Sequence, residues 1–524
     1  MSTQQEAPAT AGLAPELVER LVGIVSAAPG RPQQASLSPF DGSVLGRVPV
    51  CDAADVQEAV ATARAAQPAW AARPDQERAA VMLRFHDLVL GAEDRLLDLV
   101  QAETGKSRLS ALEELADVAG TARYYARAAH RHLRPRRRQG AIPGLTATVE
   151  QHQPKGVVGI ISPWNYPLTL AVSDAVPALL AGNGVVLKPD SQTVFTALAA
   201  VELLHEAGVP RELFQVVTGP GRELGTPLIG SVDYLMFTGS TQTGRTVAEQ
   251  CSRRLIGFSA ELGGKNPMIV LEDGDVDAAA AGAVRGCFGS SGQLCISIER
   301  LYVHDQVYDR FVTAFVERVR SMHLAAGIGW AGDMGPLTSA AQLETVTRHV
   351  EDARAKGARI LAGGRARPDL ALHFFEPTVL EGVTPDMEVA RSETFGPVVS
   401  VYRVQDEDEA VLAANDSEYG LNASVWTTPR RGREIAGRLR SGTVVVNDAY
   451  APAWGSHDAP MGGVKASGVG RRHGREGIVK YTEVQTVATQ RLLPIAPPGR
   501  MGAEEYARWL TGALRVIKRV PFLS

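Results

Sequence analysis

The sequence is poor in cysteine and shows no excess of positive charge. Its 524 residues include only 4 cysteines, with no C-x-x-C pair and no His/Cys cluster at zinc spacing. We therefore expect neither a disulfide framework nor a bound metal. The formal net charge of -4 disfavours a nucleic-acid binder, which needs clustered Lys and Arg. Small-molecule chemistry is the more probable class.

Long apolar runs are also missing. No segment reaches the roughly 18 apolar residues that a membrane span requires. The first residues, Met1 to Pro8, contain neither the basic stretch nor the apolar stretch of a signal peptide. We expect no integral membrane insertion and a cytoplasmic location.

The pattern of apolar residues predicts an α/β fold. Between residues 156 and 264, short β-branched runs alternate with helix-like segments, which is typical of a doubly wound parallel sheet. A second β and α series from about 266 to 447 predicts another α/β lobe, with the active site between the lobes. The expected strands include Val157–Ile161, Val185–Leu187, Phe214–Val217, Tyr234–Phe237, Asn266–Val270, Arg300–Val303 and Thr443–Val446.

Three further segments have simple interpretations. A loose arm and one short helix are expected in residues 1 to about 35. The basic run His130–Arg138 is read as a solvated face rather than a nucleic-acid patch. Residues 141–151 alternate like a strand with a Pro-Gly turn and predict a protruding hairpin.

The C-terminal segment predicts an amphipathic helix. Docking on its own or a neighbouring subunit is favoured, and a peripheral membrane contact or a lid over the substrate tunnel are the alternatives. The apolar positions and the positive charges that define it are Tyr506, Trp509, Leu510, Ala513, Leu514, Ile517, Arg508, Arg515, Lys518 and Arg519.

One cysteine stands in a setting suited to nucleophilic catalysis. Cys295 ends the run Phe288–Cys295, where Gly289 to Gly292 would let the backbone turn tightly. Taken alone, a buried and inert thiol is the more common explanation. Its companions are Glu261, a candidate general base beside two glycines, and Asn165, a candidate oxyanion donor on a proline-bounded loop. A capping carboxylate and a turn asparagine are the plainer alternatives for these two.

A phosphate-binding loop is indicated by the segment Phe237–Gly244, which follows a strand and opens a helix. It imitates a P-loop, but Arg245 replaces the phosphate lysine, which disfavours nucleotide hydrolysis.

Seven motifs together resemble those of the NAD(P)-dependent aldehyde dehydrogenase family, in the family's order from about residue 40 to 490. These are Trp164-Asn165, Lys188-Pro189, Phe237–Ser240, Glu261–Lys265, Gly292–Cys295, Glu393–Pro397 and Gly462–Gly468.

The resemblance implies a mechanism. Cys295 would attack the aldehyde, Asn165 and the Cys295 backbone N–H would hold the oxyanion, and a hydride would pass to the nicotinamide. Glu261 would activate the water that hydrolyses the thioester, which favours the hydrolytic branch over the CoA-acylating one. Retention of these three residues disfavours a catalytically silent structural or binding protein of this fold.

The resemblance also implies the cofactor-binding residues. They are Ile161, Ser162, Pro163, Trp164, Asn165, Lys188, Pro189, Asp190, Ser191, Gly239, Ser240, Leu262, Gly263, Glu393 and Phe395. Ser191 stands where NAD-preferring members carry a glutamate, so NADP is predicted, with NAD as the alternative. The neighbouring Asp190 would oppose a 2′-phosphate if its carboxylate pointed inward.

The implied domains are a cofactor-binding domain (1–138 and 154–264), a catalytic domain (265–480), a small β oligomerisation element (139–153 and 481–495) and a C-terminal helix extension (496–524). A homodimer or homotetramer is expected.

The motifs indicate the substrate less directly than they indicate the reaction. The motifs look most like a bacterial branch of NADP-dependent succinate-semialdehyde dehydrogenases, yet Ser173 and Gly289 replace the two arginines that bind the substrate carboxylate there. Ser456 and His457 are candidates for compensation. The apolar flanks of Cys295, Leu294 and Ile296, together with Tyr166 and the tail, favour the alternative of medium-chain, fatty or aromatic aldehydes.

Overall fold

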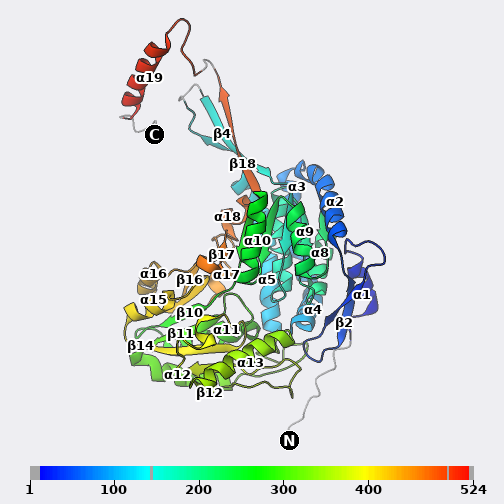
Figure 1. The fold of residues 1–524 in the computed structure, drawn as a ribbon, viewed down its shortest axis with the longest axis vertical. Coiled ribbons are helices and arrows are strands. Elements are labelled where there is room, and N and C mark those ends of the chain that lie inside the picture. Colours follow the sequence, from blue (N-terminus) through cyan, green and yellow to red (C-terminus); the bar gives the residue numbers. More distant parts are fainter. Residues whose placement is uncertain (1–11, 142–145, 492–494, 519–524) are drawn as a thin grey trace.

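The computed structural model describes residues 12–141, 146–491 and 495–518, which form two α/β lobes and a thin arm (Figure 1). The predicted N-terminal arm at 1–11, the turn at 142–145, residues 492–494 and Arg519 lie outside the described residues. The α/β class is confirmed.

The first lobe is built on a six-stranded sheet in the order β17-β9-β8-β5-β6-β7. Five strands are parallel, and β17 pairs antiparallel with β9 at one edge. Their bounds are β5 (Val157–Ile161), β6 (Gly184–Lys188), β7 (Phe214–Val216), β8 (Tyr234–Thr238), β9 (Gly257–Glu261) and β17 (Gly468–Val469).

Helices cover both faces of this sheet because its strands are apolar on both sides. Side chains such as Val157 and Leu235 pack with α2 (Ala53–Ala71), α9 (Gly221–Ser231) and α10 (Thr241–Arg254). Alternate residues such as Val158 and Met236 pack into a larger core on the opposite face. That core contains α3 (Asp75–Gly91), α4 (Glu93–Thr104), α5 (Arg108–Leu133), α6 (Pro167–Val172), α7 (Ala175–Leu180) and α8 (Val194–Ala207).

The second lobe contains a seven-stranded sheet in the order β12-β13-β14-β11-β10-β15-β16, parallel except for β12. Its strands are β10 (Asn266–Val270), β11 (Ile298–His304), β12 (Arg359–Ala362), β13 (Thr378–Glu381), β14 (Val398–Val404), β15 (Asn422–Trp426) and β16 (Thr443–Val446). Its helices are α11 (Val276–Phe288), α12 (Asp305–Arg320), α13 (Ala340–Ala355), α14 (Glu388–Arg391), α15 (Glu407–Asn415) and α16 (Pro429–Ala436).

The arm is an antiparallel sheet of three strands, β3 (Arg136–Arg138), β4 (Thr146–Pro154) and β18 (Thr482–Gln490). Strand β18 is an edge strand, and nearly all of its residues are exposed. The arm leads to α19 (Ala503–Ile517), which has no buried residue and lies beyond the arm tip (Figure 1). The helix is confirmed, but it docks on neither lobe of its own chain.

The remaining elements are short. They are α1 (Pro15–Val22), β1 (Gln33–Leu37), β2 (Val44–Pro49), α17 (Ala451–Trp454) and α18 (Gly474–Val479).

The predicted strands are confirmed within a residue or two at each end, because each is an apolar run buried in a parallel sheet. The domain boundaries stay a prediction. Strand β17 joins the first sheet, and Ile478 and Tyr481 belong to the first core, so the chain returns to the first lobe before residue 480. Among the described helices, none is long and apolar enough to cross a membrane.

Candidate active site

A cavity opens where the strand order of the first sheet reverses. Successive strands β5, β6 and β7 run outward in one direction, whereas β8 and β9 lie on the other side of β5. Loops after the carboxyl ends of β5 and β8 therefore separate and leave a crevice, the usual ligand site of such sheets. The cavity measures about 280 Å³. It is lined by Pro163, Trp164, Asn165, Thr238, Gly239, Ser240, Glu261, Leu262, Gly263, Cys295, Gln342, Glu393 and Phe395.

Cys295 reaches this cavity through a left-handed turn. Ser290, Ser291 and Gly292 have φ values of 51°, 56° and 71°. A Cβ at Gly292 would lie 2.1 Å from a backbone oxygen of Gly396, so only glycine fits there. Gly289, by contrast, has an ordinary φ of -53°. The expected tight turn exists, but two serines and one glycine make it.

Asn165 is held by a buried ion pair below its loop. Its side-chain Nδ2 donates to the Gln293 backbone oxygen at 3.0 Å, and the amide has a second N–H to offer. Lys106 Nζ donates to the Asn165 backbone oxygen at 2.6 Å and to Glu114 at 2.7 Å. Glu114 in turn accepts from the Leu168 backbone N–H at 2.8 Å, so the first turn of α6 is fixed as well. The geometry suits an oxyanion donor.

Glu261 ends β9 with its carboxylate 5% exposed, and its Oε1 atom has no hydrogen-bond partner among the protein atoms. Burial raises the pKa of Glu261 to about 7, although the positive charges of Arg472 and Lys480 oppose the shift. Burial likewise raises the pKa of the Cys295 thiol to about 12, again opposed by Arg472. A carboxylate with this pKa is half ionised at neutral pH and can serve as a base.

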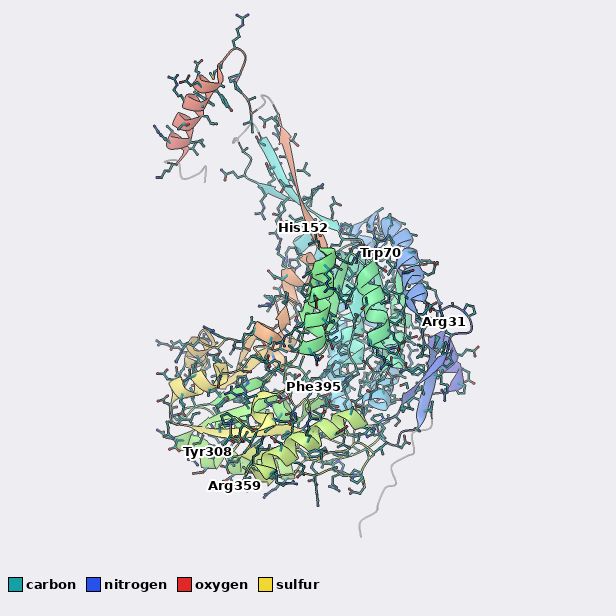
Figure 2. The ribbon with its side chains drawn as sticks, in the orientation of Figure 1. Arg31, Trp70, His152, Tyr308, Arg359 and Phe395 are labelled. Carbon is teal, nitrogen blue, oxygen red and sulfur yellow. The ribbon has the colours of Figure 1, made fainter. Side chains whose placement is uncertain are left out.

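The opposite wall of the cavity is held by a second buried ion pair, between Lys265 and Glu299. Glu299 accepts the backbone N–H of Phe395 at 3.0 Å, which fixes the loop that carries Glu393. The backbone N–H of Gly264 donates to Glu393 at 2.7 Å. Phe395 lies between the lobes in Figure 2, with its ring centroid 5.5 Å from that of Trp164.

The predicted adenosine-side residues lie next to this cavity rather than in its lining. The Ser162 backbone N–H donates to the Lys188 backbone oxygen at 3.1 Å, which joins the ends of β5 and β6. Lys188 is buried, and its Nζ lies 3.8 Å from the position of a Cβ at Gly221, in the first turn of α9. The Ser191 hydroxyl is buried without a protein partner. Asp190 accepts the Gln192 backbone N–H at 3.0 Å.

These groups fit a dinucleotide. Ser240 caps α10, whose 14-residue dipole and free N–H groups favour a pyrophosphate at this end. The buried Lys188 and the unpartnered Ser191 hydroxyl supply donors for a ribose or its phosphate. Ile161 and Pro189 contribute the adjoining strand end and loop.

Three residues around the site were not predicted from the sequence. Thr238 and Gln342 line the cavity, and Gln342 Nε2 donates to the Phe395 backbone oxygen at 2.7 Å. Arg472 is paired with Asp174 at 2.6 Å and acts on both Glu261 and Cys295 by its charge. Gln342 is far from the motifs in sequence, and Arg472 follows the Gly462–Gly468 motif by four residues without being part of it, so no local signal identifies either.

The side of Cys295 away from the cofactor cavity is apolar. Its cluster contains Tyr166, Leu170, Leu294, Ile296, Leu421, Ala449, Tyr450 and Met461, with Trp454 against it. Two of these rings bind a carboxylate: Glu113 accepts a hydrogen bond from Tyr450 at 3.2 Å and from Tyr166 at 3.4 Å.

The residues considered for substrate-carboxylate binding are engaged elsewhere. Ser173 donates its hydroxyl to Asp117 at 2.8 Å. Ser456 donates to the Pro452 backbone oxygen at 2.6 Å, and His457 lies 3.4 Å from Asp117. Both side chains therefore already have contacts within the protein, and compensation by Ser456 and His457 stays a prediction.

Comparison with known proteins identifies relatives over nearly the whole chain. The model of the aldehyde dehydrogenase family matches residues 25–487. A protein of Mycolicibacterium smegmatis, provisionally named a succinate-semialdehyde dehydrogenase, NADP(+), is 58% identical over 92% of this chain and 93% of its own. A similarly named protein of Mycobacterium tuberculosis is 55% identical over 94% of this chain and 95% of its own. The crystal structure of succinate-semialdehyde dehydrogenase from Burkholderia pseudomallei superposes with a TM-score of 0.84 at 35% identity, covering 88% of this chain and 96% of that one.

Proposed function

Because this chain belongs to the aldehyde dehydrogenase family, we propose that it oxidises succinate semialdehyde to succinate with NADP. The observation that carries the chemistry is the single cavity at the strand reversal, which Cys295, Glu261 and Asn165 line together. The names of relatives at 58% and 55% identity support the substrate and the cofactor. A catalytically silent binding protein would not require a nucleophile, a base and an oxyanion donor around one cavity.

In the proposed mechanism, the Cys295 thiol loses its proton to solvent as its sulfur forms a bond to the aldehyde carbon, and the Asn165 amide stabilises the oxyanion that results. Bound NADP would supply the hydride acceptor at this point, and loss of hydride from that carbon would leave a thioester on Cys295. Glu261 then takes a proton from a water molecule that attacks the thioester. The C–S bond breaks, the carboxylic acid leaves, and the proton held by Glu261 passes to the sulfur and restores the thiol.

Around the nicotinamide and its ribose, the proposed contacts are those of Trp164, Leu262, Gly263, Glu393 and Phe395 on the walls of the cavity. The remaining predicted residues, at the ends of β5, β6 and β8, would hold the pyrophosphate and the adenosine. An NADP preference is supported by the neutral Ser191 beside Lys188, and by the hydrogen bond that ties Asp190 to its own loop.

A second candidate function rests on the apolar cluster beside Cys295. Its aromatic rings, and Glu113 hydrogen-bonded to two of them, suit an uncharged tail better than a carboxylate. Medium-chain, fatty or aromatic aldehydes are therefore the alternative substrates.

The cytoplasmic location and a homodimer or homotetramer are also part of the proposal. The exposed edge strand β18 presents Val484 and Val487, and such an edge is suited to pairing with another chain. The exposed face of α19 suits a neighbouring subunit or a membrane surface.

The pKa of Glu261 predicts how turnover depends on pH. Since the base is the ionised carboxylate, the rate of thioester hydrolysis should rise with pH and level off above about 7. Below that pH it should fall by about tenfold per unit. The rate of steady-state turnover after the first cycle, measured as a function of pH, shows this fall in rate at acidic pH. As a control, Glu113→Gln removes a half-buried carboxylate outside this cavity, and the fall in rate below pH 7 should remain. If the rate instead falls only near the ordinary pKa of a glutamate, the assignment of Glu261 as the base is contradicted.

The cofactor assignment is tested by kcat/KM with NADP and with NAD. NADP should be preferred, and Ser191→Glu should lower kcat/KM for NADP by at least about tenfold, because a carboxylate would repel the 2′-phosphate. Asp190→Asn is the comparison at the neighbouring position: its amide oxygen can still accept from the Gln192 backbone N–H, so kcat/KM for NADP should fall far less than in Ser191→Glu. A higher kcat/KM for NAD in the unaltered protein would overturn the proposal.

The substrate assignment is tested by comparing succinate semialdehyde with hexanal and benzaldehyde. The leading proposal expects the highest kcat/KM for succinate semialdehyde. If hexanal or benzaldehyde is preferred, the second candidate replaces it, and the Cys295 chemistry stands unchanged.

A further inference from the structure

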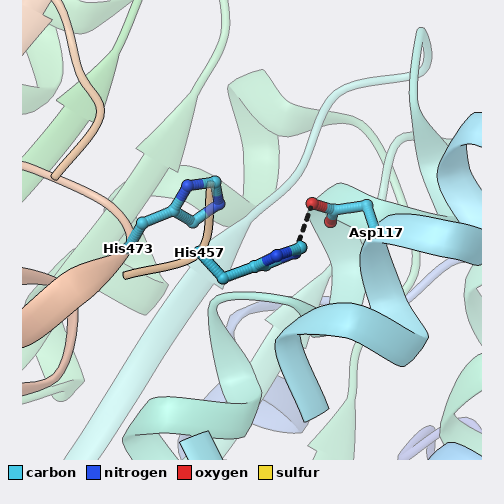
Figure 3. A group of neighbouring side chains, drawn as sticks. All are labelled: Asp117, His457 and His473. Carbon is cyan, nitrogen blue, oxygen red and sulfur yellow. Dashed lines mark ion pairs between the residues drawn. The ribbon is translucent and has the colours of Figure 1, made fainter. Parts of the chain in front are cut away.

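Apart from the cavity at Cys295, three side chains of types that can coordinate a metal ion lie close together between helix α5 and the segment that follows β16. They are Asp117, His457 and His473, and Figure 3 shows them facing one another. One ligand atom of each lies within 4.8 Å of those of the other two. No motif in the sequence joins them, because residue 117 is more than 300 positions from the two histidines.

Each of the three side chains has a buried polar atom without a hydrogen-bond partner among the protein atoms. These atoms are Oδ1 of Asp117, Nε2 of His457 and Nδ1 of His473. Asp117 is only 4% exposed and His473 only 7% exposed. Unsatisfied buried polar atoms are rare in folded proteins, and one on each member of the same cluster calls for a further partner.

The spacing fits a metal ion. In a tetrahedral zinc site with bonds of about 2.0 to 2.1 Å, two ligand atoms lie about 3.3 to 3.4 Å apart. Asp117 Oδ1 and His457 Nε2 are 3.4 Å apart, without the geometry of a hydrogen bond. The third ligand atom, on His473, lies within 4.8 Å of the other two.

A small cavity beside two of the three side chains, Asp117 and His473, has room for one atom or one water, and His457 is not part of its lining. The cavity that Asp117, Ser173, Trp454, Arg472 and His473 line measures about 10 Å³, about one water-sized sphere. Because a carboxylate forms part of it, a cation is favoured over an anion. Arg472 is the one cation in that lining, and its guanidinium is already paired with Asp174 at 2.6 Å.

The surroundings hold these ligands in place. Ser173 donates to Asp117 Oδ2, which leaves Oδ1 for the cluster, an outer-shell contact typical of metal sites. A Cβ at Gly120 of α5 would lie 2.6 Å from the His457 ring, so a helix glycine makes the room for that ring. His473 has φ 59° and ψ 172°, a backbone conformation that glycine alone adopts without strain.

We propose that Asp117, His457 and His473 form a binding site for one divalent transition-metal ion of the zinc class. Two imidazoles and one carboxylate are the ligand set that such ions take, with a fourth position left for water. This departs from the expectation that the chain binds no metal, which rested on sequence spacing alone.

A bound ion would join α5 to both ends of the segment 457–473. That segment includes Met461, and Trp454 stands just before it, with its ring centroid 6.1 Å from that of Tyr166 in the apolar cluster beside Cys295. Metal binding would therefore stiffen one wall of the apolar cluster beside Cys295 and raise the melting temperature.

The test is a titration with Co²⁺, whose visible absorption reports bound metal. The protein carries Cys295→Ala, so that the thiol cannot bind the ion, and is treated with chelator and desalted. We expect one Co²⁺ per chain, displaced by Zn²⁺, and a higher melting temperature with metal. Asp117→Asn and His457→Gln should each weaken binding by at least about tenfold, and Ser173→Ala by about tenfold.

Two further variants separate ligand loss from misfolding. His473→Gly removes a ligand while relieving the strained backbone, so the metal-free protein should melt no lower than its parent and yet lose Co²⁺ binding. His205→Gln is the matched control, because that ring lies on α8 and contacts the Val209 backbone oxygen, and it should bind as the parent does. The absence of Co²⁺ binding, or equal binding by all these variants, would overturn the proposal and leave Asp117 and His457 as a plain ion pair.

Discussion

The burial of Glu261 is the constraint on which the rest of the site depends. A carboxylate that is 5% exposed and has an oxygen without a partner is costly to keep ionised, and burial raises its pKa to about 7. The same burial holds the Cys295 thiol protonated until a base is at hand. The positive charge of Arg472 limits both pKa shifts, and that of Lys480 also limits the shift of Glu261, so Arg472 tunes the two reactive groups together.

Such a site works only if the walls do not move. Each wall is held by a buried lysine–glutamate pair that also binds the backbone of a loop. Lys106 and Glu114 fix the Asn165 loop, and Lys265 and Glu299 fix the loop of Glu393 and Phe395. Removing one partner of a buried pair typically costs 3–5 kcal/mol, because the other charge is left unpaired. These pairs therefore maintain the geometry without touching a reactant.

Sequence reasoning predicted the parallel strands well, because a buried strand such as Val157–Ile161 is a continuous apolar run. It also placed Cys295, Glu261 and Asn165 together, since each follows a strand or turn that the motifs mark. It missed Arg472, Gln342 and the meeting of Asp117 with His473, because these contacts join distant segments and leave no local pattern. It assigned the tight turn to the glycine-flanked run Gly289 to Gly292, of which Gly292 does adopt the left-handed conformation, but so do Ser290 and Ser291, and Gly289 does not. Composition does not reveal such a conformation in serine.

The most direct test of the central claim is the mass of the Glu261→Gln protein after one cycle with substrate and cofactor. If Glu261 is the base for hydrolysis, the variant should form reduced cofactor once and then hold the acyl group as a thioester. Digestion should locate that added mass on the Cys295 peptide, and Cys295→Ser should show none. An unmodified Cys295 peptide, with turnover continuing at the rate of the unaltered protein, would contradict the account.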